Sequence, residues 1–125
     1  MSLRLNTRAV NGVSVVDVSG RITLGDGASE LREALRLMAA EGHKKILLDL
    51  GAVTYIDSSG IGSLVSSFAT IRNEGGQLKL MNVAGRVMDL LLITKLHTVF
   101  EVYDDEASAI ESFDIRTAGV SGSIT

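Results

Sequence analysis

The sequence has no cysteine and no tryptophan, and aromatic residues make up only 4% of its 125 residues. Without thiols the chain forms no disulfide bond and carries out no thiolate chemistry, and its core must be built from aliphatic side chains. No apolar run approaches the ~20 residues that a membrane-spanning helix needs, and the first six residues lack the apolar core of a signal peptide. We therefore expect a cytoplasmic protein without a membrane partner.

A surplus of basic charge is also missing. Twelve Lys and Arg stand against fifteen Asp and Glu, for a formal net charge of -3. Proteins that bind the phosphate backbone of nucleic acids carry basic surfaces, whereas here Lys44 and Lys45 are the only adjacent basic pair. Nucleic acid is therefore not an expected partner. The length suffices for one domain with a single buried core.

The hydrophobic pattern predicts a compact α/β domain. Two strands, at residues 3–10 and 13–19, flank Asn11-Gly12, a dipeptide that favours a two-residue hairpin because both residues accept a positive φ. Helical and strand patterns then alternate. We expect helices from after the break at Gly25-Asp26-Gly27 to about residue 41, from Ser58 or Ser59 to before Gly75, at 85–95 and at 104–113. Strands are expected at 46–50, 78–83 and 99–103.

This order of elements predicts a mixed β-sheet with a leading hairpin and about four helices, because strands joined through helices pair in parallel. The continuous apolar run at 46–50 is typical of a central strand that is covered on both faces. The domain is expected to span residues 1–116, and residues 117–125 are expected to form a flexible tail.

The segment Asp57-Ser58-Ser59-Gly60 joins a buried-strand pattern to a helix pattern. A serine there could be a nucleophile, a helix cap or a site of phosphorylation. A nucleophile needs a base within hydrogen-bond reach, and the two histidines, His43 and His97, belong to other loops. The flanking glycines of a nucleophile elbow are also missing. We therefore expect no enzymatic activity, which leaves capping and phosphorylation.

Metal and cofactor sites are not expected either. Two isolated histidines, scattered carboxylates and no cysteine make no ligand cluster. The thirteen glycines include no Gly-Lys-Ser/Thr of a phosphate-binding loop.

Two helices carry more than a core stripe. On the helix that follows Ser58, small uncharged residues share one face for about three turns. They are Ser59, Ser63, Ser66 and Thr70, flanked by Gly62 and Ser67. Such a face fits either close packing against a neighbouring helix or a smooth docking surface for a partner. The helix at 85–95 has a second apolar stripe, Met88, Leu92 and Leu96. This stripe indicates deeper burial, a partner surface or a weak homodimer contact.

The residues from Tyr55 to Gly62, together with 15–22, 46–50 and 87–100, resemble the bacterial anti-sigma-factor antagonists of the STAS family. The resemblance implies a switch that, while unphosphorylated, binds an anti-sigma factor with serine kinase activity and so frees a sigma factor. It implies that this kinase phosphorylates Ser58, next to Asp57, and that a serine phosphatase restores binding.

We accordingly predict an anti-sigma-factor antagonist that has Ser58 as phosphoacceptor and Asp57, Ser59 and Gly60 as its environment. The predicted partner-binding surface comprises Ser59, Gly62, Ser63, Ser66, Met88 and Leu92. The N–H groups that begin the helix are expected to receive the phosphate, and whether Asp57 polarises the hydroxyl or only caps the helix stays open. The alternative is a scaffold or accessory STAS subunit of a stress-signalling assembly or a lipid-transport complex, without a cycling phosphoserine.

Overall fold

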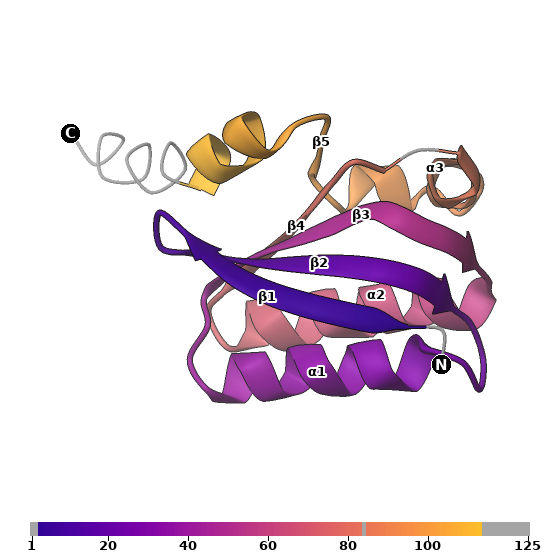
Figure 1. The fold of residues 1–125 in the computed structure, drawn as a ribbon, viewed down its shortest axis with the longest axis horizontal. Coiled ribbons are helices and arrows are strands. Elements are labelled where there is room, and N and C mark those ends of the chain that lie inside the picture. Colours follow the sequence, from indigo (N-terminus) through magenta and orange to yellow (C-terminus); the bar gives the residue numbers. More distant parts are fainter. Residues whose placement is uncertain (1–2, 84, 114–125) are drawn as a thin grey trace.

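The computed structural model describes residues 3–83 and 85–113 (Figure 1). In chain order the elements are β1 (Arg4–Val10), β2 (Val13–Ile22), α1 (Ala28–Ala40), β3 (Lys45–Ile56), α2 (Ser58–Asn73), β4 (Gln77–Met81), α3 (Gly85–Ile93), a 3-10 turn (Leu96–Thr98) and β5 (Val102–Tyr103). Residues 106–113 form a further helix, called here the 106–113 helix. The tail predicted for 117–125 lies outside the described residues.

The five strands form one mixed sheet in the order β1-β2-β3-β4-β5. β1 and β2 pair antiparallel, and every later pair is parallel. The hairpin turn is made by Asn11 and Gly12, with φ of 49° and 82°, which confirms the leading hairpin. Because α1, α2 and α3 each connect one strand to the next, the predicted α/β fold class is confirmed as well.

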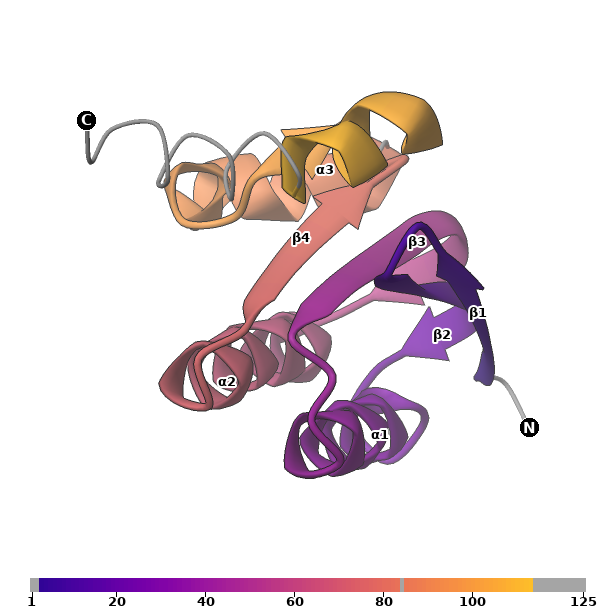
Figure 2. The same ribbon diagram turned by 90° about the vertical axis from the view of Figure 1, so that its left-hand side faces the viewer.

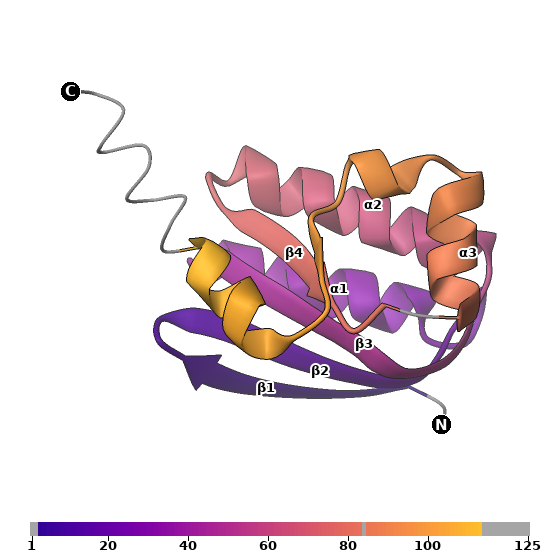
Figure 3. The same cartoon turned by 90° about the horizontal axis from the view of Figure 1, so that it is seen from above.

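Helices lie on both faces of the sheet. α1 and α2 cover one face, and the 106–113 helix lies over the other (Figures 1 and 2). Seen from above, the 106–113 helix and α3 stand at opposite ends of the sheet (Figure 3). β3 carries core residues on both sides: Ile46 and Leu48 belong to the larger apolar cluster with α1 and α2, and Leu47 packs in the smaller cluster with Ile110 and Phe113. The central position predicted for residues 46–50 is thus confirmed.

Several element bounds differ from the prediction. β2 runs to Ile22 rather than residue 19, and β4 and α3 each end two residues earlier than expected. β3 continues to Ile56 because its second half pairs with β2, across two irregularities in the register. The sequence did not indicate this extension, since Gly51, Ala52 and Thr54 are not part of an apolar run. β5 has only two residues, since the 3-10 turn occupies the chain just before it. The fourth helix begins at residue 106 rather than 104.

Arg8 ties the 106–113 helix to the hairpin. Its Nε lies 2.8 Å from Asp17 Oδ2, and its Nη2 lies 2.6 Å from Glu106 Oε1. The guanidinium lowers the pKa of both carboxyl groups, and their hydrogen bonds raise the pKa of Arg8. The described part of this helix is too short to be stable alone, so its position depends on this cluster and on the apolar contact beneath it.

Replacing Arg8 by Met should make the free energy of unfolding vary less with pH in the acidic range. A carboxyl group whose pKa is lower in the folded state stabilises that state above its unfolded pKa, near 4, and this stabilisation is lost as the pH falls through the folded value. We expect Arg8→Met to reduce the free energy of unfolding at pH 7 by about 1 kcal/mol or less, because all three side chains are about one-third exposed.

The difference should shrink as the pH falls below about 4, as measured by urea denaturation across that range. Arg4→Met, an exposed arginine on the same strand, is the control and should show a smaller, pH-independent effect. Equal effects of the two variants would contradict the role of Arg8.

Candidate functional site

The candidate site lies where β3 ends and α2 begins. Asp57 is the N-cap residue, with extended φ and ψ of -119° and -171°. Its Oδ1 accepts the Gly60 N–H at 3.0 Å, and its Oδ2 accepts the Leu24 N–H at 3.1 Å. One carboxylate therefore caps α2 and also holds the loop between β2 and α1.

The hydrogen bond from the Leu24 N–H lowers the pKa of Asp57 most, and the hydrogen bond from the Gly60 N–H lowers it further. The Asp57 carboxyl group therefore stays ionised at neutral pH, and its two oxygens accept hydrogen bonds from backbone N–H groups. Capping by Asp57 is confirmed. Both oxygens are committed to this structural role, which makes Asp57 a poorly suited proton acceptor for a neighbouring hydroxyl.

The loop beside Asp57 presents an apolar side chain that the sequence reasoning missed. Thr23 and Asp26 close a tight turn through two backbone hydrogen bonds, from Thr23 N to Asp26 O (2.8 Å) and from Asp26 N to Thr23 O (2.9 Å). Thr23 is buried, whereas Leu24 is 79% exposed. A lone leucine just before the Gly25-Asp26-Gly27 break was the available signal, because such turns rarely need an apolar residue.

The three residues after Asp57 differ in exposure. Ser58 is exposed, Ser59 is half-buried and Gly60 is buried. A Cβ at Gly60 would lie 2.1 Å from the Ile22 carbonyl oxygen and 2.5 Å from Ile56 Cγ1. Only glycine lets α2 start this close to β2, and this contact leaves the Ser58 side chain on the surface.

The prediction that Ser63 lies on an exposed surface is wrong. Its side chain is fully buried, and its hydroxyl donates to the Ala28 carbonyl oxygen at 2.8 Å and lies 3.3 Å from Arg32 Nη2. Ser67 is also buried. Small residues at these two positions let α2 pack closely against α1, so this half of the small-residue face serves helix packing.

The other half of that face stays accessible. Between the start of α1 and α2 lies a shallow, open groove of about 480 Å³, lined by Leu24, Ala28, Ser29, Arg32, Ser59, Gly62 and Ser66. Three residues of the predicted partner surface, Ser59, Gly62 and Ser66, thus lie together beside Leu24.

The second apolar stripe of α3 also has some buried and some exposed side chains. Met88 and Leu96 are partly buried and pack against the larger core cluster. Leu92 is 47% exposed, and the neighbouring Ile93, which the stripe did not include, is 75% exposed. Deeper burial of the helix therefore accounts for Met88 and Leu96 but not for Leu92.

Two arginines meet an aromatic ring at the end of β3. The Arg21 Cζ lies 5.4 Å and the Arg86 Cζ 4.9 Å from the centroid of the Tyr55 ring. Arg21 comes from the end of β2, and Arg86 comes from the first turn of α3. The elements that meet near Ser58 thus bring guanidinium groups to this end of the sheet.

A model of the STAS domain matches residues 4–109. The chain belongs to the STAS domain family. The predicted resemblance is thereby confirmed, and the match spans the hairpin, the parallel strands and the helices between them.

The relatives of this STAS domain include named regulators. An anti-sigma-B factor antagonist from Bacillus subtilis (strain 168) is 30% identical over 102 residues, which cover 82% of this chain and 92% of the relative. An anti-sigma F factor antagonist from Paenibacillus polymyxa is 26% identical over 118 residues, which cover 92% and 98%. The crystal structure of an anti-sigma factor antagonist from Mycobacterium paratuberculosis has a TM-score of 0.79 at 25% identity and covers 89% of this chain and 93% of that one.

The histidines of the STAS domain lie away from Ser58 along the chain. His43 precedes β3, where its Nδ1 lies 2.7 Å from Ser14 Oγ near the start of β2. β3 contains twelve residues, so its two ends are on the order of 40 Å apart in an extended strand. His97 belongs to the 3-10 turn. Among residues 3–83 and 85–113, no three His, Asp or Glu side chains group as metal ligands, and none of the helices described there is long and apolar enough to cross a membrane.

Alanine substitutions at two glycines of α2 should have opposite effects. Gly60→Ala forces a Cβ into the Ile22 carbonyl, so we expect it to lower the free energy of unfolding by about 1–3 kcal/mol. A Cβ at Gly62 would meet open space, and Gly62→Ala should raise stability by about 0.5–1 kcal/mol because alanine favours the helix. Chemical denaturation measures both, and a stable Gly60→Ala protein would contradict the close approach of α2 to β2.

Proposed function

We propose that this STAS domain is an anti-sigma-factor antagonist whose binding to an anti-sigma factor is controlled by phosphorylation of Ser58. The observation that carries the proposal is the exposed hydroxyl at the first position of α2, next to a capped and rigid turn. The names of its relatives support the choice of partner. The protein would act in the cytoplasm as a binding module and would catalyse no reaction itself.

The anti-sigma factor would act as the serine kinase. It would bring ATP and Mg²⁺ and transfer the γ-phosphoryl group to Ser58 Oγ, with ADP leaving and the hydroxyl proton passing to a base of the kinase. A base supplied by the kinase is favoured because both oxygens of Asp57 already accept hydrogen bonds from backbone N–H groups. A serine phosphatase would return the hydroxyl by hydrolysis of the phosphate ester.

The docking surface would surround Ser58. Ser59, Gly62 and Ser66 offer a smooth wall on which a partner backbone can come close, and Leu24 offers an apolar side chain for a pocket of the partner. Leu92 on α3 remains a candidate for its outer part. Ser63 is excluded from this surface by its burial.

Electrostatics would make phosphorylation an effective switch. A phosphoserine adds about -1.5 to -2 charges, and Asp57 is already ionised beside it. A partner that covers Ser58 would have to displace water from this added charge and pack against it, at a cost of several kcal/mol. A cost of about 3 kcal/mol weakens binding roughly a hundredfold, with no change of shape.

Aspartate at position 58 should prevent binding to the anti-sigma partner. We expect Ser58→Asp to fold normally, because the side chain is exposed, and to bind the partner at least about a hundredfold more weakly in calorimetry. Ser58→Ala should bind like the native protein, because it adds no charge.

Ser108→Asp is the matched control. Ser108 is an exposed serine in the first turn of the 106–113 helix, on the opposite face of the sheet from α2 (Figure 2). It should bind like the native protein, and tight binding by Ser58→Asp would disprove the switch.

Incubation with candidate anti-sigma kinases and ATP should place one phosphate on Ser58, as mapped by mass spectrometry of peptides. Ser58→Ala should abolish the label, whereas Ser59→Ala should retain it because Ser59 is half-buried. Phosphate on Ser59, or none with any kinase, would reject Ser58 as phosphoacceptor. Co-purification with a transporter ATPase instead of a kinase would favour the alternative role as a scaffold or accessory subunit.

A further inference from the structure

The Tyr55 ring holds two positive charges next to each other. The distances from its centroid put the guanidinium carbons of Arg21 and Arg86 at most about 10 Å apart. The Arg21 side chain is about half exposed, and Arg86 is exposed. Contact with one aromatic ring restricts both side chains, and their exposure leaves N–H donors accessible to solvent. These three residues are called the arginine–tyrosine cluster below.

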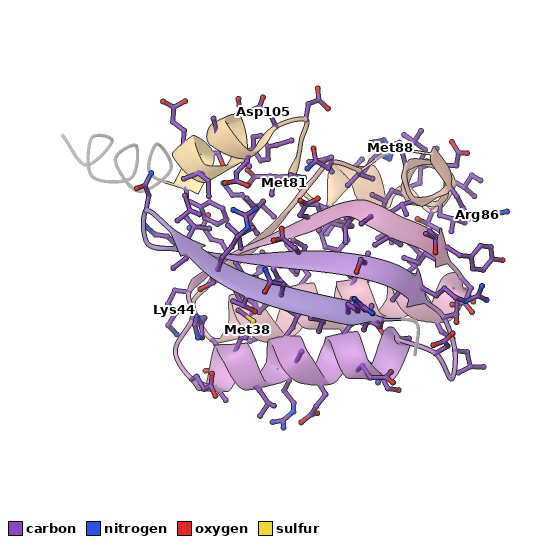
Figure 4. The ribbon with its side chains drawn as sticks, viewed as in Figure 1. Met38, Lys44, Met81, Arg86, Met88 and Asp105 are labelled. Carbon is purple, nitrogen blue, oxygen red and sulfur yellow. The ribbon has the colours of Figure 1, made fainter. Side chains whose placement is uncertain are left out.

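The cluster has more positive charge than its neighbours balance. Asp26 Oδ2 lies 3.4 Å from Arg21 Nε, a long contact between half-exposed groups that is worth little in water. Arg86 is the second residue of α3, where the helix dipole disfavours a cation and favours an anion. Figure 4 shows Arg86 reaching outward at the end of the molecule where β3 terminates. An anion within reach of both guanidinium groups would offset their mutual repulsion and the unfavourable interaction of Arg86 with the helix dipole.

Ser58 lies within reach of this cluster. Arg21 is the partner of Tyr55 in the register of β2 and β3, and the Asp57 N–H donates to the Ile22 carbonyl at 3.4 Å. Ser58 follows Tyr55 by three residues, a stretch of chain that spans at most ~10 Å. A long arginine side chain and a phosphoserine together can bridge that distance.

The Asp57 carboxylate already engages backbone donors at the start of α2 that a phosphate at Ser58 could use. The Gly60 N–H is bound to Asp57 Oδ1, and the Ser59 N–H also interacts with the Asp57 carboxylate. The helix start therefore offers a phosphate at Ser58 fewer backbone donors than an uncapped helix would, with an ionised carboxylate beside them.

We propose that Arg21 and Arg86, held against Tyr55, receive the phosphoryl group of phosphorylated Ser58. The inference rests on the proposed function, since it takes Ser58 as the phosphoacceptor, and it adds the groups that hold the modified state. Guanidinium groups bind phosphate oxygens through charge-assisted hydrogen bonds. The phosphate then stays on the surface of the folded domain, and the positive charge of the cluster is masked in the phosphorylated form.

The test is a pH titration of phosphoserine placed at position 58 during translation and followed by ³¹P NMR. An unperturbed phosphoserine has its second pKa near ~6. Arginine contacts favour the dianion, so we expect a lower pKa in the native background. Arg21→Ala and Arg86→Ala should each raise it, and the two together should raise it by on the order of one unit.

Arg72→Ala is the matched control, because it removes the same exposed charge fourteen residues further along α2. That separation is about 21 Å at 1.5 Å per residue, which is about twice the Debye length at 0.1 M salt. The phosphate pKa in the Arg72→Ala variant should therefore equal that in the native background. A second readout is the Nε–H signals of Arg21 and Arg86, which should shift between the unmodified and the phosphorylated protein.

A phosphate pKa that is the same in the cluster variants as in the native background, or equal effects of the cluster variants and Arg72→Ala, would overturn the inference. Because phosphoserine is introduced during translation, this result does not depend on any kinase. Failure of the proposed function would instead appear as absent phosphorylation or as tight partner binding by Ser58→Asp, so the two failures are distinguishable.

Discussion

The carboxylate of Asp57 joins two parts of the chain that lie 33 residues apart, the Leu24 N–H and the start of α2. Much of the local geometry depends on it. With its other oxygen on the Gly60 N–H, Asp57 fixes the loop between β2 and α1 against the end of β3. Gly60 makes this possible, since a larger residue would collide with the Ile22 carbonyl. The result is a rigid corner that presents Leu24 and Ser58 to solvent.

Occupation of the helix N-terminus by Asp57 has a chemical consequence for Ser58. A phosphate on the first residue of a helix would ordinarily use the free N–H groups there. Here the ionised Asp57 carboxylate already accepts the Gly60 N–H, which favours side-chain donors for the proposed phosphate. The arginine–tyrosine cluster, whose Tyr55 lies on the strand that precedes Ser58, offers candidates from β2 and α3. Partner binding and phosphate retention would then use neighbouring but different side chains.

The two faces of the sheet serve different purposes. The face under α1 and α2 carries the larger apolar cluster and supports the corner at Ser58. On the other face, the short 106–113 helix covers Val13, Val15 and Leu47. The buried Lys79 lies beneath it, with its Nζ 2.9 Å from Ser112 Oγ, 3.1 Å from Glu101 Oε1 and 4.5 Å from the Phe113 ring centroid. A buried ammonium group with these partners fixes the position of the helix more than it adds stability.

The sequence by itself determined the hairpin at Asn11-Gly12, the alternation of helices and strands, and the junction at Asp57-Ser58, because these depend on local turn chemistry and hydrophobic period. Only the tertiary structure decided which small residues of α2 are exposed. Ser63 and Ser66 look alike in sequence, yet the packing of α1 buries the first and leaves the second at the groove. Tertiary contacts likewise joined Arg21, Tyr55 and Arg86, since a contact between distant segments leaves no periodic signal in any one of them.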